Sequence, residues 1–150
     1  MDEISIKRLI LAAPLVYRKD DALCFPAYGA VRGEVLFRMV LDPVQSRSIE
    51  PDRTAFPGRL VAAGYAAAPE KEGAGRLELP ARAYFFAQVR ESPSRETIDT
   101  ETLIDMMIKV QKEGLWERAS LDACLYIRRL FEDGRAVTQI FRPLSEKMGI

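Results

Sequence analysis

The spacing of apolar and polar residues changes twice along the second half of the chain. These changes predict a strand, then a helix and then a hairpin. Residues 82–89 form an aromatic and aliphatic run flanked by charge, typical of a strand, and Leu77-Glu-Leu79 alternates just ahead of Pro80. Residues 91–96 are polar and contain a proline, so they are expected to link this strand to the next element.

A helix is predicted next, because apolar side chains recur at three- and four-residue spacing. Asp99 or Thr100 can cap its first turn, where Glu101 is well placed against the helix dipole. Gly114 is expected to follow the last helical residue. The apolar face consists of Leu103, Ile104, Met106, Met107, Ile108 and Val110.

Residues 121–144 predict a closing hairpin with its turn at Asp133-Gly134, which suits the two positive-φ positions of a type I′ turn. The turn sets a register that pairs Leu130 with Val137, Ile127 with Ile140, and Tyr126 with Phe141. Both faces of the hairpin mix apolar and charged side chains. We therefore expect helices to cover one face of the sheet and the other to form a partly apolar, concave surface.

The first half of the chain gives weaker patterns. Residues 4–17 are rich in branched aliphatics and predict one strand, followed by a polar turn at 18–21. Residues 29–42 fit a helix and a strand about equally well. Residues 44–58 predict a long loop. Residues 59–68 predict a strand whose Gly64 allows close approach of a helix backbone or a ligand.

Together these elements predict an α+β fold, a mostly antiparallel sheet with one or two helices packed on it. A chain of 150 residues suits a single domain, and its composition of 48% apolar and 29% charged residues is that of an ordinary globular protein. The second half, 59–144, is predicted as β-β-α-β-β.

Charge and composition remove several function classes. Basic and acidic residues balance at 22 each, without the basic excess of a nucleic-acid-binding protein, so no nucleic-acid partner is expected. The chain has no histidine, which excludes Ser-His-Asp and Cys-His nucleophiles and histidine-containing zinc sites. No metal and no cofactor are expected. The carboxylates of Glu78, Glu101, Asp105 and Asp122 are not paired at a catalytic spacing, which leaves enzymatic activity undecided and disfavoured.

Cys24 and Cys124 lie among apolar residues, which predicts buried reduced thiols, with a disulfide or a reactive thiol as the alternatives. The first residues lack the basic region of a signal peptide, and no apolar run is long enough to span a bilayer. We therefore expect a cytoplasmic protein without membrane association.

Short motifs in the second half resemble those of the GyrI-like effector-binding domains. These are the small-molecule sensing domains of AraC-type and MerR-type regulators, and they also occur as free-standing proteins. Leu79-Pro80-Ala81 and Tyr84 match the family's strand motif, and Pro143-Leu144 matches the end of its last strand. The resemblance runs mainly over 59–144. It implies two β-α-β-β halves and a ligand cleft between their helices, and the first half, 1–58, would then need its helix at residues 29–42.

The chain departs from that family at two places. Arg82-Ala83 stands where the family has a glycine, so the turn into the strand must differ. The family's ligand-binding glutamate, on the strand after the helix, has no counterpart in Cys124-Leu125-Tyr126. Binding of a cationic ligand through that carboxylate therefore does not carry over to this chain.

Two functional hypotheses follow. The first is a stand-alone ligand-binding domain for an apolar or aromatic small molecule, with Glu34 and Arg38 as polar groups of the cleft if 29–42 is helical. The second is a protein-interaction or adaptor domain that uses its sheet edge or hairpin, with Arg128, Arg129 and Arg135 as a basic rim. The first hypothesis assigns the cleft lining to Tyr65, Tyr84, Phe86, Trp116, Tyr126 and Phe141, all of which also suit ordinary core packing.

Overall fold

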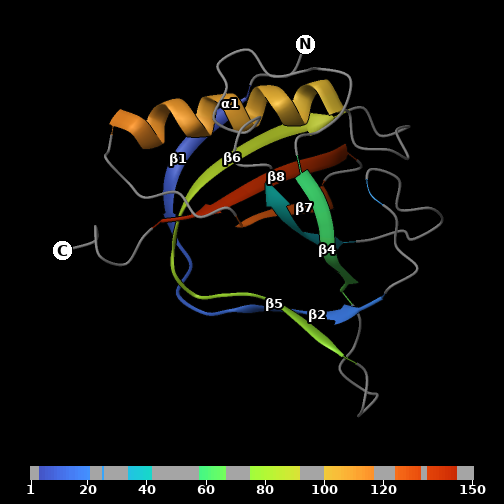
Figure 1. Cartoon of the computed structure of the whole chain (residues 1–150). Coiled ribbons are helices and arrows are strands. Elements are labelled where there is room, and N and C mark those ends of the chain that lie inside the picture. Colours follow the sequence, from blue (N-terminus) through green and yellow to red (C-terminus); the bar gives the residue numbers. More distant parts are fainter. Residues whose placement is uncertain are drawn as a thin grey trace.

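Eight strands and one helix make up the part of the chain that the structure describes (Figure 1). This computed structural model describes residues 4–20, 25, 34–41, 58–66, 75–91, 100–116, 124–132 and 135–144. The elements are β1 (Ser5–Ile10), β2 (Leu15–Lys19), β3 (Val35–Leu41), β4 (Gly58–Tyr65), β5 (Arg76–Leu79), β6 (Ala83–Glu91), α1 (Thr100–Trp116), β7 (Cys124–Glu132) and β8 (Arg135–Pro143).

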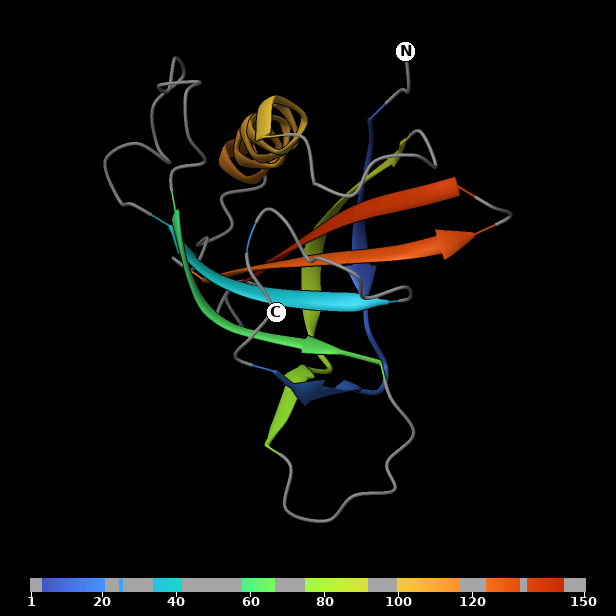
Figure 2. The same cartoon turned by 90° about the vertical axis from the view of Figure 1, so that its right-hand side faces the viewer.

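All eight strands belong to one sheet, in the order β1-β6-β8-β7-β3-β4-β2-β5, and every neighbouring pair is antiparallel. The predicted antiparallel sheet is therefore confirmed. The α+β class is met only in part, because strands dominate the described residues and α1 is their one helix. The sheet curls strongly, as the view turned by 90° shows (Figure 2).

The curl arises where two segments bend side by side. β1 pairs with β6 and, beyond the bend, β2 pairs with β5. Pro14 and Pro80 lie in the two bends, where a residue without an N–H cannot continue a strand ladder. The Leu11 N–H donates to the Arg82 carbonyl at 3.0 Å and ties the bends together. The prediction of one strand over 4–17 is thus wrong, and residues 18 and 19 belong to β2 rather than to a turn.

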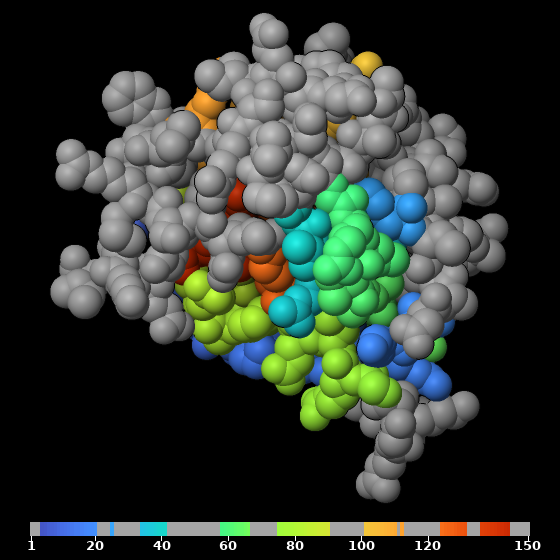
Figure 3. Space-filling model, in the orientation of Figure 1, coloured from blue at the N-terminus to red at the C-terminus, as the bar shows by residue number. Residues whose placement is uncertain are grey.

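Gly64 lies on β4 where β2 pairs with it, opposite Lys19. A Cβ at Gly64 would stand 2.9 Å from the Arg18 carbonyl oxygen. That distance is too short for any side chain, so glycine is required at this close approach. The partner that approaches Gly64 closely is a strand backbone, not the helix or ligand expected from the sequence. In the space-filling view, β3, β4, β5 and β2 form one continuous surface (Figure 3).

β3 settles the ambiguity over 29–42 for the residues described. Residues 35–41 form a strand with Val35, Phe37 and Met39 buried on the face that α1 covers. The helix required there by two β-α-β-β halves is absent over 35–41, while 29–33 and 42 lie outside the described residues. A central strand buried on both faces reads as a nearly continuous apolar run, which is why its period resembled that of a helix.

The helix prediction is confirmed, and α1 packs on one face of the sheet (Figures 1 and 2). The predicted apolar positions of α1 are buried in the core below it, except Ile108, which is half-buried. Gly114 lies inside α1, so the expected helix end there is wrong. One interior glycine costs a helix only about 1 kcal/mol, less than the packing of the preceding turns can supply. Asp99 lies outside the described residues.

The closing hairpin adopts the predicted register, with Leu130 opposite Val137 and Ile127 opposite Ile140. Its turn at Asp133-Gly134 lies outside the described residues. The odd-numbered residues of β7 face α1, and the even-numbered residues face the opposite, concave side of the sheet. β2 and β5 curl over that concave side and pack against it through Tyr17, Leu77 and Leu79.

Candidate functional site

Four of the six aromatic residues predicted to line a cleft meet on the concave side. Tyr84 and Phe86 of β6, Phe141 of β8 and Tyr126 of β7 lie in one buried cluster. They pack edge to face, with ring centroids 5.0 Å apart for Phe86 and Phe141 and 5.6 Å apart for Tyr84 and Phe141. Antiparallel register places Phe86 opposite Phe141 and Phe141 opposite Tyr126, so the three strands bring the rings together.

Of the other two aromatic residues, Tyr65 is not part of this cluster. Tyr65 packs against the core on the α1 side, and the Arg18 guanidinium lies 5.9 Å from its ring centroid. Trp116 is the last residue of α1, and its side chain lies outside the described part of the chain. Tyr65 therefore does not share a surface with the four aromatic residues of the concave side.

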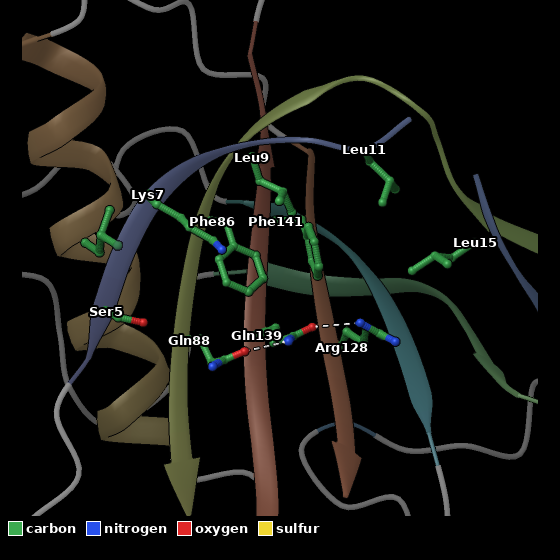
Figure 4. Close-up of a pocket in the computed structure, with 11 residues that line it drawn as sticks. Ser5, Lys7, Leu9, Leu11, Leu15, Phe86, Gln88, Arg128, Gln139 and Phe141 are labelled. Carbon is green, nitrogen blue, oxygen red and sulfur yellow. Dashed lines mark hydrogen bonds between the residues drawn. The ribbon is translucent and has the colours of Figure 1, made fainter. Parts of the chain in front are cut away.

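A hollow of ≈ 340 Å³ opens on the concave side, beside this cluster (Figure 4). Its apolar wall is formed by Leu9, Leu11, Leu15, Phe86 and Phe141. The leucines come from β1, from the bend and from the start of β2, and the two rings come from β6 and β8. The bend near Pro14 thus carries apolar side chains across the concave side, where they form part of the wall of the hollow.

Polar side chains form the other wall of the hollow, as one hydrogen-bonded row. Arg128 donates through Nη1 to Gln139 Oε1 at 3.0 Å, and Gln139 donates through Nε2 to Gln88 Oε1 at 2.7 Å (Figure 4). The three residues come from the adjacent strands β7, β8 and β6 and lie opposite one another in register. We call Arg128, Gln139 and Gln88 the polar row.

Glu34 and Tyr17 hold the arginine end of the polar row. Arg128 Nη2 lies 2.7 Å from Glu34 Oε1, as a hydrogen bond and an ion pair, and the Tyr17 hydroxyl donates to Glu34 Oε2. Burial and the bond to Glu34 raise the pKa of the Tyr17 phenol well above its ordinary value. Burial works to lower the pKa of Arg128, but the bond to Glu34 and nearby negative charge outweigh it and raise that pKa.

Lys7 completes the rim of the hollow. Its amino group lies 5.5 Å from the centroid of the Phe86 ring. Lys7 stands directly opposite Phe86 in the pairing of β1 with β6. Ser5 and Lys7 lie at one side of the hollow, and Leu11 and Leu15 lie at the other (Figure 4). The hollow is therefore apolar toward the bend and polar toward the middle of β6, β8 and β7.

Glu34 and Arg38, the two polar residues predicted for the cleft, lie in different places. Glu34 does contact the polar row, although it precedes a strand rather than lying on a helix. Arg38 lies on β3 opposite Tyr126, outside the lining of the hollow. The Tyr126 phenol raises the pKa of Arg38, and burial followed by the neighbouring Cys124 raises the pKa of Tyr126 to about 12.

The basic rim expected for an adaptor domain is not formed as predicted. Arg129 is fully buried on the α1 side of the sheet, and Arg128 belongs to the hollow. The Arg135 side chain lies outside the described part of the chain. Adjacent residues of a strand point to opposite faces, so Arg128 and Arg129 cannot form a common rim.

Other groups of residues give no chemical site. Within the described ranges, no three His, Cys, Asp or Glu residues come together to hold a metal ion. Cys124 is a free, half-buried thiol, and Cys24 lies outside those ranges. The helix that the structure describes is not long and apolar enough to cross a membrane.

The polar row was not predicted from the sequence, although one of its pairs could have been. The register set by Asp133-Gly134 already pairs Arg128 with Gln139. Gln88 and Lys7 could not be added, because they join through the long-range pairings of β6 with β8 and of β1 with β6. Neither a protein-family model nor a curated protein matches the chain. Its function is therefore inferred from the geometry of the hollow.

Proposed function

We propose that this protein is a ligand-binding domain of the effector-sensing kind, and that an apolar or aromatic small molecule occupies the hollow on its concave side. The observation that carries the proposal is the division of the hollow into an apolar wall and a hydrogen-bonded polar row. Small-molecule sites typically combine mostly apolar walls with a few fixed polar groups that orient the ligand.

The size of the hollow supports this function. A volume of ≈ 340 Å³ falls within the range of about 300–1,000 Å³ that is usual for ligand sites. It corresponds to about eleven water molecules at the ≈ 30 Å³ that each occupies in the liquid. A ligand with one aromatic ring and a short chain would therefore fill much of it, against Phe86 and Phe141.

The rigidity of the walls supports it further. Phe141 is 2% exposed and Phe86 is 7% exposed, and each packs edge to face against a neighbouring ring. Arg128 is held by Glu34 on one side and by Gln139 on the other. A ligand would meet side chains that are already ordered, so little conformational entropy would be lost on binding.

A thermal-shift screen against uncharged and charged aromatic and aliphatic compounds tests the proposal. A true ligand at a hundredfold excess over its Kd adds about 2.7 kcal/mol to stability. In a chain of this size that raises the unfolding midpoint by roughly 5–10 °C. Leu11→Trp, which fills the hollow, is expected to abolish the shift.

Val61→Trp serves as the matched control, because Val61 is exposed on β4 and is not part of the lining. The control should keep the full shift. A screen without any saturable shift, or a shift that survives Leu11→Trp, would contradict the proposal.

The likeness to GyrI-like effector-binding domains stays a prediction. A ligand site on the concave side of a curled sheet agrees with a sensing function. The absence of a helix over 35–41 means that a cleft between two helices is not the basis of the present proposal.

A protein-interaction function is the second candidate, and one observation favours it. β1 is an outermost strand in the sheet order, and Ile10 on it is 79% exposed. A strand at a sheet edge can pair with another chain. This alternative predicts a flat thermal-shift screen together with capture of a protein partner that Ile10→Lys abolishes.

A further inference from the structure

The hydrogen bonds of the polar row all point the same way. An arginine side chain can only donate, so the Gln139 group that faces Arg128 must be its carbonyl oxygen. The Gln139 amino group is then turned toward Gln88 and requires the Gln88 carbonyl oxygen as its acceptor. Arg128 thereby fixes the orientation of both amides.

The free end of the row is consequently a donor. The Gln88 carbonyl is occupied by Gln139, so its NH₂ group is what the row presents at the β6 end of the hollow. Figure 4 draws that nitrogen on the side of Ser5, which lies opposite Gln88 in the pairing of β1 with β6. Any group that binds there must accept a hydrogen bond.

Positive charge lies next to this donor. Lys7 is two residues from Ser5 on the same face of β1, and its amino group stands over the Phe86 ring. Arg128 Nε at the other end of the row is buried and finds no hydrogen-bond partner in the described part of the chain. Among the lining residues that the structure describes, none carries a carboxylate, and Glu34 is bound by Arg128 and Tyr17.

We propose that the ligand of the hollow is an amphipathic monocarboxylate, an apolar or aromatic body that ends in one carboxyl group. Its carboxylate accepts hydrogen bonds from the Gln88 amide and the Lys7 ammonium group. Its apolar body lies against Phe86, Phe141 and the leucines of the bend. This inference rests on the proposed function and adds the chemical class of the ligand.

Other ligand charges fit the hollow less well. A cation would face Lys7 and Arg128 with no free carboxylate among the described lining residues to balance it. A compact inorganic anion would leave the wall of Leu9, Leu11 and Leu15 uncovered. A carboxylate is an acceptor at both oxygens, and hydrogen bonds to a charged group are roughly twice as strong as neutral ones.

Three probes that share one apolar body test the charge of the head group. Phenylbutyrate, phenylbutanol and phenylbutylamine are titrated separately into the full chain by isothermal calorimetry. Phenylbutyrate is expected to bind about tenfold or more tightly than phenylbutanol, which corresponds to one charge-assisted hydrogen bond, and the amine should bind weakest.

Gln88→Glu provides a sharp test, because it keeps the acceptor for Gln139 and replaces the terminal donor by a negative charge. The variant should weaken phenylbutyrate binding by about tenfold or more and strengthen phenylbutylamine binding. Lys7→Gln, at an exposed position, should weaken phenylbutyrate by about three- to tenfold and leave phenylbutanol unchanged. Lys109→Gln makes the same charge change on the exposed surface of α1 and should alter neither.

The outcomes separate this inference from the function on which it rests. Equal binding of acid and alcohol, or tightest binding of the amine, would overturn the carboxylate assignment and leave the hollow as a ligand site. Absence of binding by all three probes would count against both. If Lys7→Gln and Lys109→Gln weaken phenylbutyrate binding equally, the role of Lys7 is overturned, since the effect would be one of net charge alone. If Gln88→Glu fails to fold, Lys7→Gln decides the question.

Discussion

At the scale of single residues, Arg128 determines how the polar wall is arranged. It carries the donors that orient Gln139, and it forms the ion pair with Glu34. The hairpin register was predicted from Asp133-Gly134, so the Arg128 and Gln139 pair follows from sequence. The bond from Gln139 to Gln88 does not, because nothing local in the sequence specifies which residue of β6 lies opposite Gln139.

Gln139→Leu is expected to cost about 1–3 kcal/mol of unfolding free energy. It leaves Arg128 Nη1 and Gln88 Oε1 without their partner in the polar row, and Gln139 itself is only 7% exposed. Urea unfolding monitored by circular dichroism measures the change. Gln88→Leu removes only the end of the row and should cost less, and an equal or larger cost for Gln88→Leu would contradict a row directed from Arg128.

Alkaline pH is expected to destabilise the protein through its buried tyrosines. Burial raises the pKa of Tyr17, Tyr84 and Tyr126 above the ordinary value of 10.0. Their stabilising contribution is thus fully present below pH 10.0. Above it, the unfolded chain loses phenolic protons that the folded chain keeps, so stability falls by about 1.4 kcal/mol per pH unit for each tyrosine.

Tyr17→Phe should remove one of these contributions. The difference in unfolding free energy between about pH 9 and about pH 11 is expected to shrink by roughly 1 kcal/mol relative to wild type, as measured by urea unfolding at both values. At neutral pH the variant should lose about 1 kcal/mol, because Glu34 loses a donor. An unchanged alkaline slope would show that the Tyr17 phenol ionises normally in the folded protein.

At the scale of elements, the paired bends of β1–β2 and β5–β6 create the concave side. Prolines in these two segments indicate strand ends already in the sequence. The sequence does not indicate that both segments pair again beyond the bend. Gly64 shows the same limit. Its small size signalled a close approach, and only the tertiary fold reveals that the approaching group is the β2 backbone.

Gly64→Ala is expected to destabilise the protein by about 1–3 kcal/mol, because the new Cβ would stand 2.9 Å from the Arg18 carbonyl oxygen. Gly75→Ala is the matched control, since its Cβ would meet only the Lys19 side chain at 3.4 Å. Urea unfolding of the two variants provides the comparison. Equal stability of both would refute the close approach of the β2 backbone to Gly64.

The α1 helix was predictable because its signal is local and periodic. Met107→Ala should lower the unfolding free energy by about 2–5 kcal/mol, since Met107 is fully buried between α1 and the sheet. Lys109→Ala, at an exposed position of the same helix, should change it by no more than about 0.5 kcal/mol. Thermal unfolding of the pair measures both. Similar costs would mean that α1 does not pack through its predicted apolar face.

At the scale of the whole molecule, the sequence predicted an antiparallel sheet, a helix and a two-faced hairpin. Phe86 and Phe141, two of the residues predicted to line a cleft, lie in one cluster of the structure. It could not predict the order of the eight strands. The pairings of β1 with β6 and of β2 with β5 join segments far apart in the chain. The hollow depends on those pairings, since they bring Leu9, Leu11 and Leu15 to the two rings.

Methyl NMR spectroscopy during titration with phenylbutyrate tests whether this hollow binds an apolar small molecule. If it does, saturable shifts are expected for the methyl groups of Leu9, Leu11 and Leu15, which line the hollow. The methyl groups of Ile104 and Val110, buried on the opposite face below α1, should stay unchanged. Shifts confined to the α1 side, or no saturable shift at any of these leucines, would show that the hollow is not the binding site.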